Sequence, residues 1–302
     1  MRLQFKEVVG SMEQKILFIG LGIMGAPMAK NILQKDFDVA VCDIDKNVVN
    51  NFKEVVSMAS TKPSEAANQR NVIVMMLPNS DVVNAVLFCE GGALETCASN
   101  SLFVDMSTGS YPKMMKIAKR VAGLGHRFVD APVGRTPREA ITGDLLVMAG
   151  GDLADIKSLR NIFDAIANKI VHVGPVGSGL KTKLVNNYMA MINNAVTAET
   201  LSFAHSVGLD IDATAELMSS TTAGLGQLNT NYTKKVLAND LSPDFPITMA
   251  IKDLDMAIEL ANSFDSERLF GDLAKKLFVD AEEVGMGKLD QTAILTYLLN
   301  DQ

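Results

Sequence analysis

Short apolar runs alternate with helical stretches along the first half of the chain. Charged residues are rare within these runs, as in strands that are covered on both faces of a sheet. The expected strands lie at 15–20, 38–43, 71–78, 101–107, 126–133, 144–151 and 170–175. Helices are expected between them, at 23–34, 81–88 and 111–122. This alternation predicts βαβ units in a doubly wound, mostly parallel sheet.

The pattern changes after Gly179. Residues 180–207 contain no Pro, no Gly and no strand signal, which predicts one helix of about 28 residues, or ~40 Å. Apolar residues occupy most of its circumference, so we expect it to be buried between other elements. The chain after Gly208 predicts further helices joined by short loops. We therefore expect an N-terminal extension (1–13), an α/β domain (14–176) and an all-α domain (177–302) that is entered through the long helix.

Composition and charge narrow the choice of partners. The 302 residues are 48% hydrophobic and 21% charged, with a net charge of −7 and no long Lys/Arg run, so we expect no nucleic-acid partner. No apolar stretch reaches the length of about 18 residues that a membrane span needs. The leading residues lack a sustained apolar core, which argues against a secretory signal and predicts a cytoplasmic protein. Three sparse cysteines without metal-ligand spacing suit a reducing compartment, and we expect no metal site.

The loop after the first expected strand fits the pattern G-x-G-x-x-G. Its sequence is Gly20-Leu21-Gly22-Ile23-Met24-Gly25. Because it follows a strand and opens a helix, it has the context that a dinucleotide-binding motif requires. Gly20 permits the turn, Gly22 lets a pyrophosphate approach the backbone, and Gly25 allows close packing of the helix on the strand. The first domain is therefore predicted to be of the Rossmann type and to bind a dinucleotide through these six residues.

Asp43 ends the second expected strand. A carboxylate at this place accepts hydrogen bonds from both hydroxyls of the adenosine ribose and repels a 2′-phosphate, which predicts NAD(H) rather than NADP(H). Leu77 and Pro78 lie at the exit of the 71–78 run, where such sheets bind ligands, and are expected to contact the cofactor. A plain strand stop is the alternative interpretation of these two residues.

A second candidate site lies in the stretch GSGLKTKLVNN. Lys183 and Asn187 are four residues apart and share one helix face, with Asn186 one step around. An ammonium group among apolar residues is costly unless it meets a ligand or a water-filled cleft, so Lys183 is a candidate proton donor. On spacing alone, a Lys that reaches solvent from the start of a helix is an equally good interpretation.

Five stretches in order resemble the β-hydroxyacid dehydrogenase family, which includes 3-hydroxyisobutyrate dehydrogenase. They are GLGIMGAPMAKNIL, FVDMST, DAPV, GSGLKTKLVNN and IKDLDMAIE. The resemblance implies reversible hydride transfer with Lys183 as the acid/base, and Asn187 holding Lys183 or the substrate. It also implies that Ser107 touches the substrate, while Thr108 and Lys252 lie near the cofactor. Members of the family are dimers or tetramers, so a homodimer or homotetramer is expected.

The residues after DAPV bear on the substrate. The family usually has Ser-Gly-Gly there, whereas this chain has Gly134-Arg135-Thr136. With TAGLG and KVLANDLSPDF, this stretch resembles the branch that reduces 3-sulfolactaldehyde to 2,3-dihydroxypropane-1-sulfonate with NADH. A sulfonate is a permanent anion, and Arg is a permanent cation with its donors in a fixed fork. The resemblance implies an anionic aldehyde held by these three residues, with Asn186 and Asn187 opposite.

Two other functions stay open. Arg also binds carboxylates, and Ala190 stands where the sulfonate-reducing branch has a hydroxyl residue. A reductase or dehydrogenase of a carboxylate substrate, such as tartronate semialdehyde, succinate semialdehyde or 3-hydroxyisobutyrate, is therefore the second hypothesis. Arg135 or Arg138 could instead form a salt bridge on the loop surface. The third hypothesis is a nucleotide-binding protein without turnover, against which the pair Lys183 and Asn187 argues.

Overall fold

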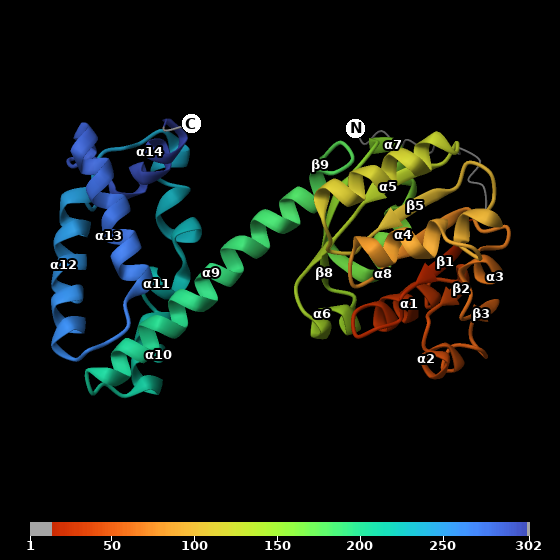
Figure 1. The fold of residues 1–302 in the computed structure, drawn as a ribbon, viewed down its shortest axis with the longest axis horizontal. Coiled ribbons are helices and arrows are strands. Elements are labelled where there is room, and N and C mark those ends of the chain that lie inside the picture. The colour runs from red at the N-terminus through yellow and green to blue at the C-terminus, as the bar shows by residue number, and fades with distance from the viewer. Residues whose placement is uncertain (1–13, 301–302) are drawn as a thin grey trace, which may run out of the picture. The chain divides into compact units, whose positions relative to one another are not determined.

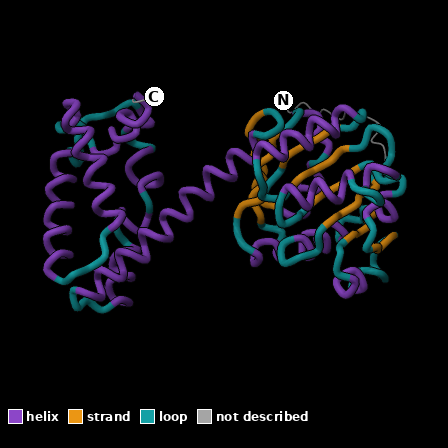
Figure 2. The backbone as a smooth tube through the Cα atoms, in the orientation of Figure 1, coloured by secondary structure: helices purple, strands orange, loops and turns teal. Residues whose placement is uncertain are grey.

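The computed structural model describes residues 14–300, and the chain forms two compact units. Among the described residues, unit 1 comprises 14–188 and unit 2 comprises 189–300. The expected N-terminal extension, residues 1–13, lies outside the described residues. Within the described part, the strands belong to unit 1, while unit 2 consists of helices and loops (Figure 2).

Unit 1 is built on a nine-stranded sheet of order β3-β2-β1-β4-β5-β6-β8-β7, with β9 paired to β8 (Figure 1). The strands are β1 (Lys15–Ile19), β2 (Asp38–Cys42), β3 (Met58–Ser60), β4 (Val72–Met75), β5 (Leu102–Asp105), β6 (Arg127–Asp130), β7 (Val133–Gly134), β8 (Leu145–Gly150) and β9 (Ala167–Gly174). Strands β1 to β6 are parallel and follow the Rossmann order. Strand β8 is antiparallel to β6 and β7, and β9 is parallel to β8. The predicted doubly wound, mostly parallel sheet is confirmed.

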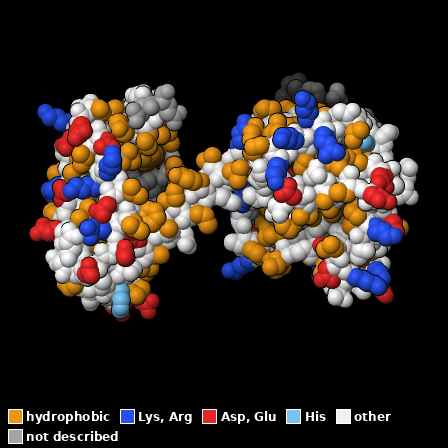
Figure 3. Space-filling model, in the orientation of Figure 1, with side chains coloured by type: hydrophobic (Ala, Val, Ile, Leu, Met, Phe, Trp, Pro, Cys, Tyr) orange, Lys and Arg blue, Asp and Glu red, His pale blue; other side chains and the backbone are white. Residues whose placement is uncertain are grey.

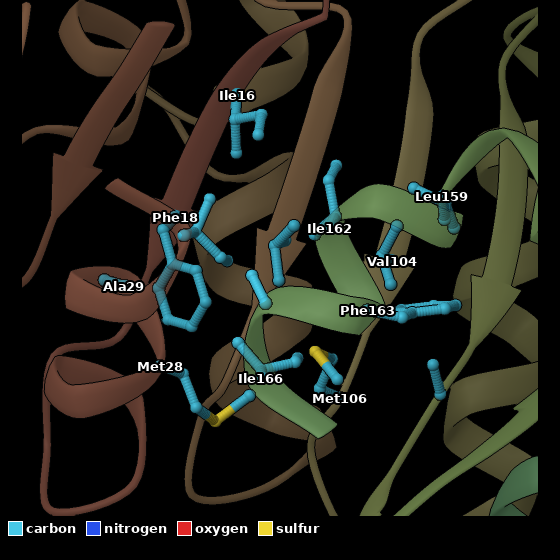
Figure 4. Packing of buried hydrophobic residues seen from close by; sticks show 14 of the residues in the cluster. Ile16, Phe18, Met28, Ala29, Val104, Met106, Leu159, Ile162, Phe163 and Ile166 are labelled. Atoms are coloured by element: carbon cyan, nitrogen blue, oxygen red, sulfur yellow. The ribbon is translucent and has the colours of Figure 1, made fainter. Parts of the chain in front are cut away.

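Helices cover both faces of this sheet (Figure 1). They are α1 (Gly25–Leu33), α2 (Lys46–Asn50), α3 (Pro63–Ala67), α4 (Ser80–Phe88), α5 (Tyr111–Gly123), α6 (Pro137–Thr142), α7 (Leu153–Ser158), α8 (Arg160–Ile166) and the start of α9 (Ser178–Ser206). Strand β1 alternates between two cores, since Ile16 and Phe18 belong to one and Leu17 and Ile19 to the other. Figure 4 shows Phe18 packed near Ala29 and Met28 of α1. Burial on both faces explains why these strands are unbroken apolar runs.

The stretch expected as one strand at 126–133 is two strands. Strand β6 ends at Asp130 and β7 begins at Val133, with Ala131 and Pro132 between them. Proline has no N–H to donate to a sheet ladder, so it interrupts the strand there. After the break, β7 pairs antiparallel with β8 instead.

Helix α9 forms as a single helix, as predicted, but the elements of unit 1 do not bury its part in that unit, residues 178–188. Among residues 178–188 only Gly179 and Leu180 are buried, whereas Val185 and Tyr188 are each 71% exposed. Hydrophobic side chains lie open along α9 in Figure 3. Only the first turn of α9 packs against the sheet, so the apolar residues beyond it find no cover within unit 1.

Unit 2 is helical. Its helices are α10 (Ile211–Ser219), α11 (Thr222–Leu225), α12 (Ile247–Ser263), α13 (Leu269–Ala281) and α14 (Ile294–Asn300). A small core of Ile247, Ala281, Ala293 and Ile294 joins the last three. The predicted all-α region after the sheet is confirmed. In residues 14–300, no helix combines the length and apolar character that crossing a membrane requires.

Candidate active site

A cleft of about 820 Å³ lies at the carboxyl ends of β1, β2 and β4, where the strand order reverses. This is the place where doubly wound sheets bind ligands. Among the predicted cofactor residues, those that line it are Gly20, Gly22, Ile23, Met24, Gly25, Asp43, Leu77 and Pro78. The lining residues that sequence reasoning missed include Ile44, Thr61, Pro63, Met76, Val82, Ala85 and Val86. The last three have i, i+3, i+4 spacing on α4, a signal that could have identified that wall.

The three glycines of the loop meet different surroundings. Gly20 has φ +96°, and a Cβ there would lie 2.2 Å from the Met76 carbonyl oxygen. A Cβ on Gly25 would lie 1.9 Å from the Gly20 carbonyl oxygen. Gly22, in contrast, has no atom within 4 Å of a Cβ position. Packing therefore requires the first and third glycines, while the second leaves open space beside the cleft, as a pyrophosphate needs.

Asp43 holds the glycine loop. Its Oδ2 accepts the Leu21 N–H at 2.6 Å, and its Oδ1 accepts the Asp45 N–H at 2.8 Å. Leu21 therefore contributes its backbone, while its side chain is buried. A carboxylate has further lone pairs, so Asp43 can still accept ribose hydroxyls. The next residue, Ile44, is 95% exposed and provides an apolar wall. These residues fit a dinucleotide.

Lys183 is half-buried on the second turn of α9. Burial lowers the pKa of its ammonium group. Within residues 14–300, Lys183 has no hydrogen bond or ion pair, whereas the Asn186 Nδ2 donates to Asn187 Oδ1 at 3.4 Å. A partly desolvated ammonium without a partner is costly, so it indicates a site that takes a ligand.

Ser107 connects the end of β5 to the wall of the cleft. Its hydroxyl accepts the Leu77 N–H at 3.0 Å, and its own N–H donates to Asp105 Oδ1 at 3.0 Å. Thr108 follows and is half-buried. Sequence reasoning missed Asp105, which is buried and whose pKa burial raises to about 6.

Arg135 has an unusual backbone conformation. Its φ of +79° lies in the left-handed region, which favours glycine. Its side chain is exposed, and Nη1 donates to the Asp144 carbonyl oxygen and, at 2.8 Å, to Asn168 Oδ1. Arg138 makes no ion pair with a described carboxylate.

Thr136 caps α6, directly after Gly134 and Arg135. Its hydroxyl donates to Glu139 Oε2 at 2.6 Å and accepts the Arg138 N–H at 3.3 Å. The Thr136 N–H also donates to Glu139, so the two residues form a capping box. Lys252, the last predicted residue, lies on α12 of unit 2, where its Nζ is 3.4 Å from Asp253 Oδ1.

A Rossmann sheet, a cleft at its switch point and a half-buried Lys on the following helix define a dinucleotide-dependent oxidoreductase. Residues 15–174 match the family model of the NAD-binding domain of 6-phosphogluconate dehydrogenase. Residues 177–298 match the model described as NAD-binding of NADP-dependent 3-hydroxyisobutyrate dehydrogenase. The chain belongs to the 3-hydroxyisobutyrate dehydrogenase family. It is an NAD-dependent oxidoreductase.

Individual relatives are similar over nearly their whole length. The 3-sulfolactaldehyde reductase of Escherichia coli (strain K12) is 37% identical, over 93% of this chain and 94% of the relative. The 2-(hydroxymethyl)glutarate dehydrogenase of Eubacterium barkeri is 30% identical, over 93% of each. A solved 3-hydroxyisobutyrate dehydrogenase from Mycobacterium tuberculosis, with L-serine, is 25% identical over 95% of this chain and 99% of that chain, with a TM-score of 0.65.

Proposed function

We propose that this protein reduces 3-sulfolactaldehyde to 2,3-dihydroxypropane-1-sulfonate with NADH. The observation that carries the proposal is Arg135 at φ +79°, where the family usually has Gly. A non-glycine residue in the left-handed region costs energy, and such residues cluster at functional sites. The 37% identity to a 3-sulfolactaldehyde reductase supports the same substrate class.

Lys183 is the proposed acid/base. When bound, the nicotinamide supplies the hydride. In the reduction, the Lys183 ammonium hydrogen-bonds the aldehyde oxygen and donates its proton as the alkoxide forms. In the oxidation, the neutral amine takes the proton from the alcohol. Burial lowers the pKa of Lys183, which makes the ammonium a better proton donor than an exposed Lys. We propose that Asn187 and Ser107 orient the substrate beside Lys183.

Arg135 is the proposed anion anchor. Its Nη1 is tied to Asp144 and Asn168, while Nε and Nη2 have no partner among the residues that the structure describes. These two donors form one edge of the guanidinium fork and suit two oxygens of a sulfonate. Such a contact contributes roughly 1.5–3 kcal/mol, or about 10–100-fold in affinity. The Thr136 hydroxyl can donate to the sulfonate only if it gives up its bond to Glu139. Gly134 and Asn186 complete the proposed substrate pocket.

Asp43 supports NADH over NADPH, because its carboxylate repels a 2′-phosphate. Thr108 and Lys252 are proposed to contact the nicotinamide end of the cofactor.

We propose the boundary between the cofactor domain (14–176) and the substrate domain (177–302) just before α9. A homodimer or homotetramer is proposed because exposed apolar residues on α9 offer a surface to a second copy. The free cysteines suit a cytoplasmic location.

The test is a substrate panel. Loss of NADH absorbance is followed with 3-sulfolactaldehyde and with tartronate and succinate semialdehydes. Activity confined to the carboxylate substrates contradicts the proposal. Arg135→Ala should raise KM for the sulfonate about 10–100-fold at similar kcat. Arg138→Ala, three residues away, is the matched control and should leave KM unchanged.

The second candidate is a carboxylate semialdehyde reductase. Ala190 favours it, because a methyl group gives no donor where the sulfonate-reducing branch has a hydroxyl residue. One variant, Ala190→Ser, distinguishes the two candidate functions by its KM values. Ala190→Ser should lower KM for the sulfonate if that group lies beside α9, and should leave all KM values unchanged if the substrate is a smaller carboxylate.

A further inference from the structure

The carboxylate of Asp130 lies at the junction between the sheet and α9. Asp130 is the last residue of β6 and is 1% exposed. Its Oδ1 accepts the Gly177 N–H at 2.6 Å, and its Oδ2 accepts the Leu180 N–H at 2.7 Å. The first N–H groups of a helix have no partner within the helix. A carboxylate satisfies them with charge-assisted bonds and also interacts favourably with the helix dipole.

Glycines leave the space that this carboxylate occupies. A Cβ on Gly150 would lie 2.6 Å from Asp130 Oδ1, and a Cβ on Gly179 would lie 3.0 Å from Asp130 Oδ2 and 2.4 Å from the Met148 carbonyl oxygen. Gly177 has φ +96°, and a Cβ there would lie 2.8 Å from Met115 Sδ and 2.9 Å from Tyr111 Cε2. A side chain at any of these positions would push the start of α9 away from the sheet. Gly150 and Gly179 therefore leave room for the Asp130 carboxylate, while Gly177 lets the start of α9 pack against Tyr111 and Met115.

We propose that Asp130 is a positioning residue for Lys183. Its carboxylate fixes the first turn of α9 on the sheet, and this fixes where the ammonium group of Lys183 lies. Lys183 follows Leu180 by three residues, or about 4.5 Å along the helix axis. Since Lys183 has no hydrogen-bond partner in the described part of the chain, its position depends on the helix backbone. The inference rests on the proposed role of Lys183 in proton transfer.

The charge state of Asp130 suits this task. Burial raises its pKa to about 6, while the N–H groups of Gly177 and Leu180 oppose that rise. The carboxyl is therefore mainly ionised at neutral pH, when both oxygens can accept. Asp105, its neighbour in the register of β5 and β6, makes no bond to α9.

The substitution Asp130→Asn tests the proposal. It keeps the size of the side chain but replaces one acceptor oxygen with a donor, so one N–H group loses its partner. We expect kcat for aldehyde reduction to fall about 10–100-fold, while KM for NADH changes less than about two-fold. The alkaline limb of the pH profile of kcat should move toward the ordinary Lys pKa, because a displaced ammonium is better solvated. Amide hydrogen exchange at residues 177–183 should become faster.

Asp155→Asn is the matched control. Asp155 is also buried, and its carboxylate pairs with Arg127, which begins the strand that Asp130 ends. This variant should lower Tm without changing kcat, the pH profile or exchange at 177–183. The proposal is overturned if Asp130→Asn keeps the wild-type profile and exchange, or if Asp155→Asn reproduces all its effects.

Two further arms keep the test decisive. If Asp130→Asn does not fold, Asp130→Ser replaces it, because serine offers one oxygen on a shorter side chain in place of the two carboxylate oxygens. If the wild-type protein reduces no aldehyde of the panel, the proposed function fails, but the exchange comparison at 177–183 still decides whether Asp130 anchors α9. Unchanged exchange at 177–183 in the Asp130 variant then contradicts the anchoring of α9 by Asp130.

Discussion

The residues of the candidate site differ in how firmly their surroundings hold them. Asp43 and Ser107 are bonded to the backbone of the cleft walls, and Thr136 is bonded within its own capping box. Lys183 has no such bond among the described residues, and Arg135 uses only Nη1. Both cations therefore keep donors available, and for both we propose direct contact with the substrate. Removing either should therefore affect turnover or substrate binding more than stability.

Lys183→Ala should abolish proton transfer while leaving the cofactor cleft intact. We expect kcat to fall at least about 10²–10⁴-fold, with an unchanged Kd for NADH measured by fluorescence titration. Lys181→Ala is the control on the same helix, since Lys181 lies over the Tyr111 ring and is exposed. A loss of NADH binding in Lys183→Ala would contradict its assignment to proton transfer.

The pH dependence of the reaction should follow the lowered pKa of Lys183. Reduction needs the ammonium form, so kcat for reduction should fall as pH rises through that pKa, which lies below the ordinary 10.5. Oxidation needs the neutral amine and should rise over the same range. Initial rates in both directions measure this. In Lys183→Arg the group stays protonated, so the alkaline fall in reduction should disappear.

The elements that could be predicted from the sequence are those with a long, regular pattern. Strand β1 and helix α9 were located to within a residue or two because apolar runs and the absence of Gly and Pro mark them. Strand β3 has three residues and was missed, since so short a segment shows no period. The exposure of α9 could not be predicted either, because a helical pattern does not say what packs against it.

The candidate site shows the same division. The glycine loop, Asp43 and Lys183 could be named as candidates from the sequence because their chemistry is local to one stretch. Ile44, Thr61 and Pro63 come from loops that meet only after folding, so no local pattern marks them. Asp130 was visible as the start of DAPV, but its bonds to Gly177 and Leu180 join residues 47 and 50 positions apart.

The glycine loop allows a direct separation of packing from ligand binding. Gly25→Ala places a Cβ 1.9 Å from the Gly20 carbonyl oxygen, so α1 must shift and stability should fall by about 1–3 kcal/mol. Gly22→Ala meets no protein atom within 4 Å, so its Tm should stay near the wild-type value while NADH binds more weakly. Calorimetry and cofactor titration of both variants measure this. Equal loss of Tm in the two would contradict the division of roles.

At the scale of the whole molecule, the stability of the fold depends on two carboxylates at the ends of adjacent strands. Asp105 and Asp130 are partners in the register of β5 and β6, and both are buried. Asp130 accepts the N–H groups of Gly177, directly before α9, and of Leu180 in its first turn, whereas Asp105 accepts, among the described residues, the N–H and the hydroxyl of Ser107. Ionised Asp105 therefore opposes folding more than it supports it, and this cost should depend on pH.

Asp105→Asn should stabilise the protein at neutral pH and lose that advantage in acid. Burial, with repulsion from Asp130, raises the pKa of Asp105 from 3.8 to about 6. Between these values the unfolded chain is ionised while the folded chain keeps the proton, so this group makes stability fall as pH rises from about 4 to 6. Above 6 the full cost is present, about 3 kcal/mol at most.

Asparagine does not titrate and still accepts the Ser107 N–H. The difference in Tm between Asp105→Asn and wild type should therefore grow from pH 4.5 to pH 7.5, about the limits of this window, because the titrating groups that do not interact with Asp105 are shared and cancel, while the repulsion from Asp130 is relieved in the variant. A difference that stays constant, or shrinks toward neutral pH, would show that Asp105 is ionised in the folded protein throughout this range.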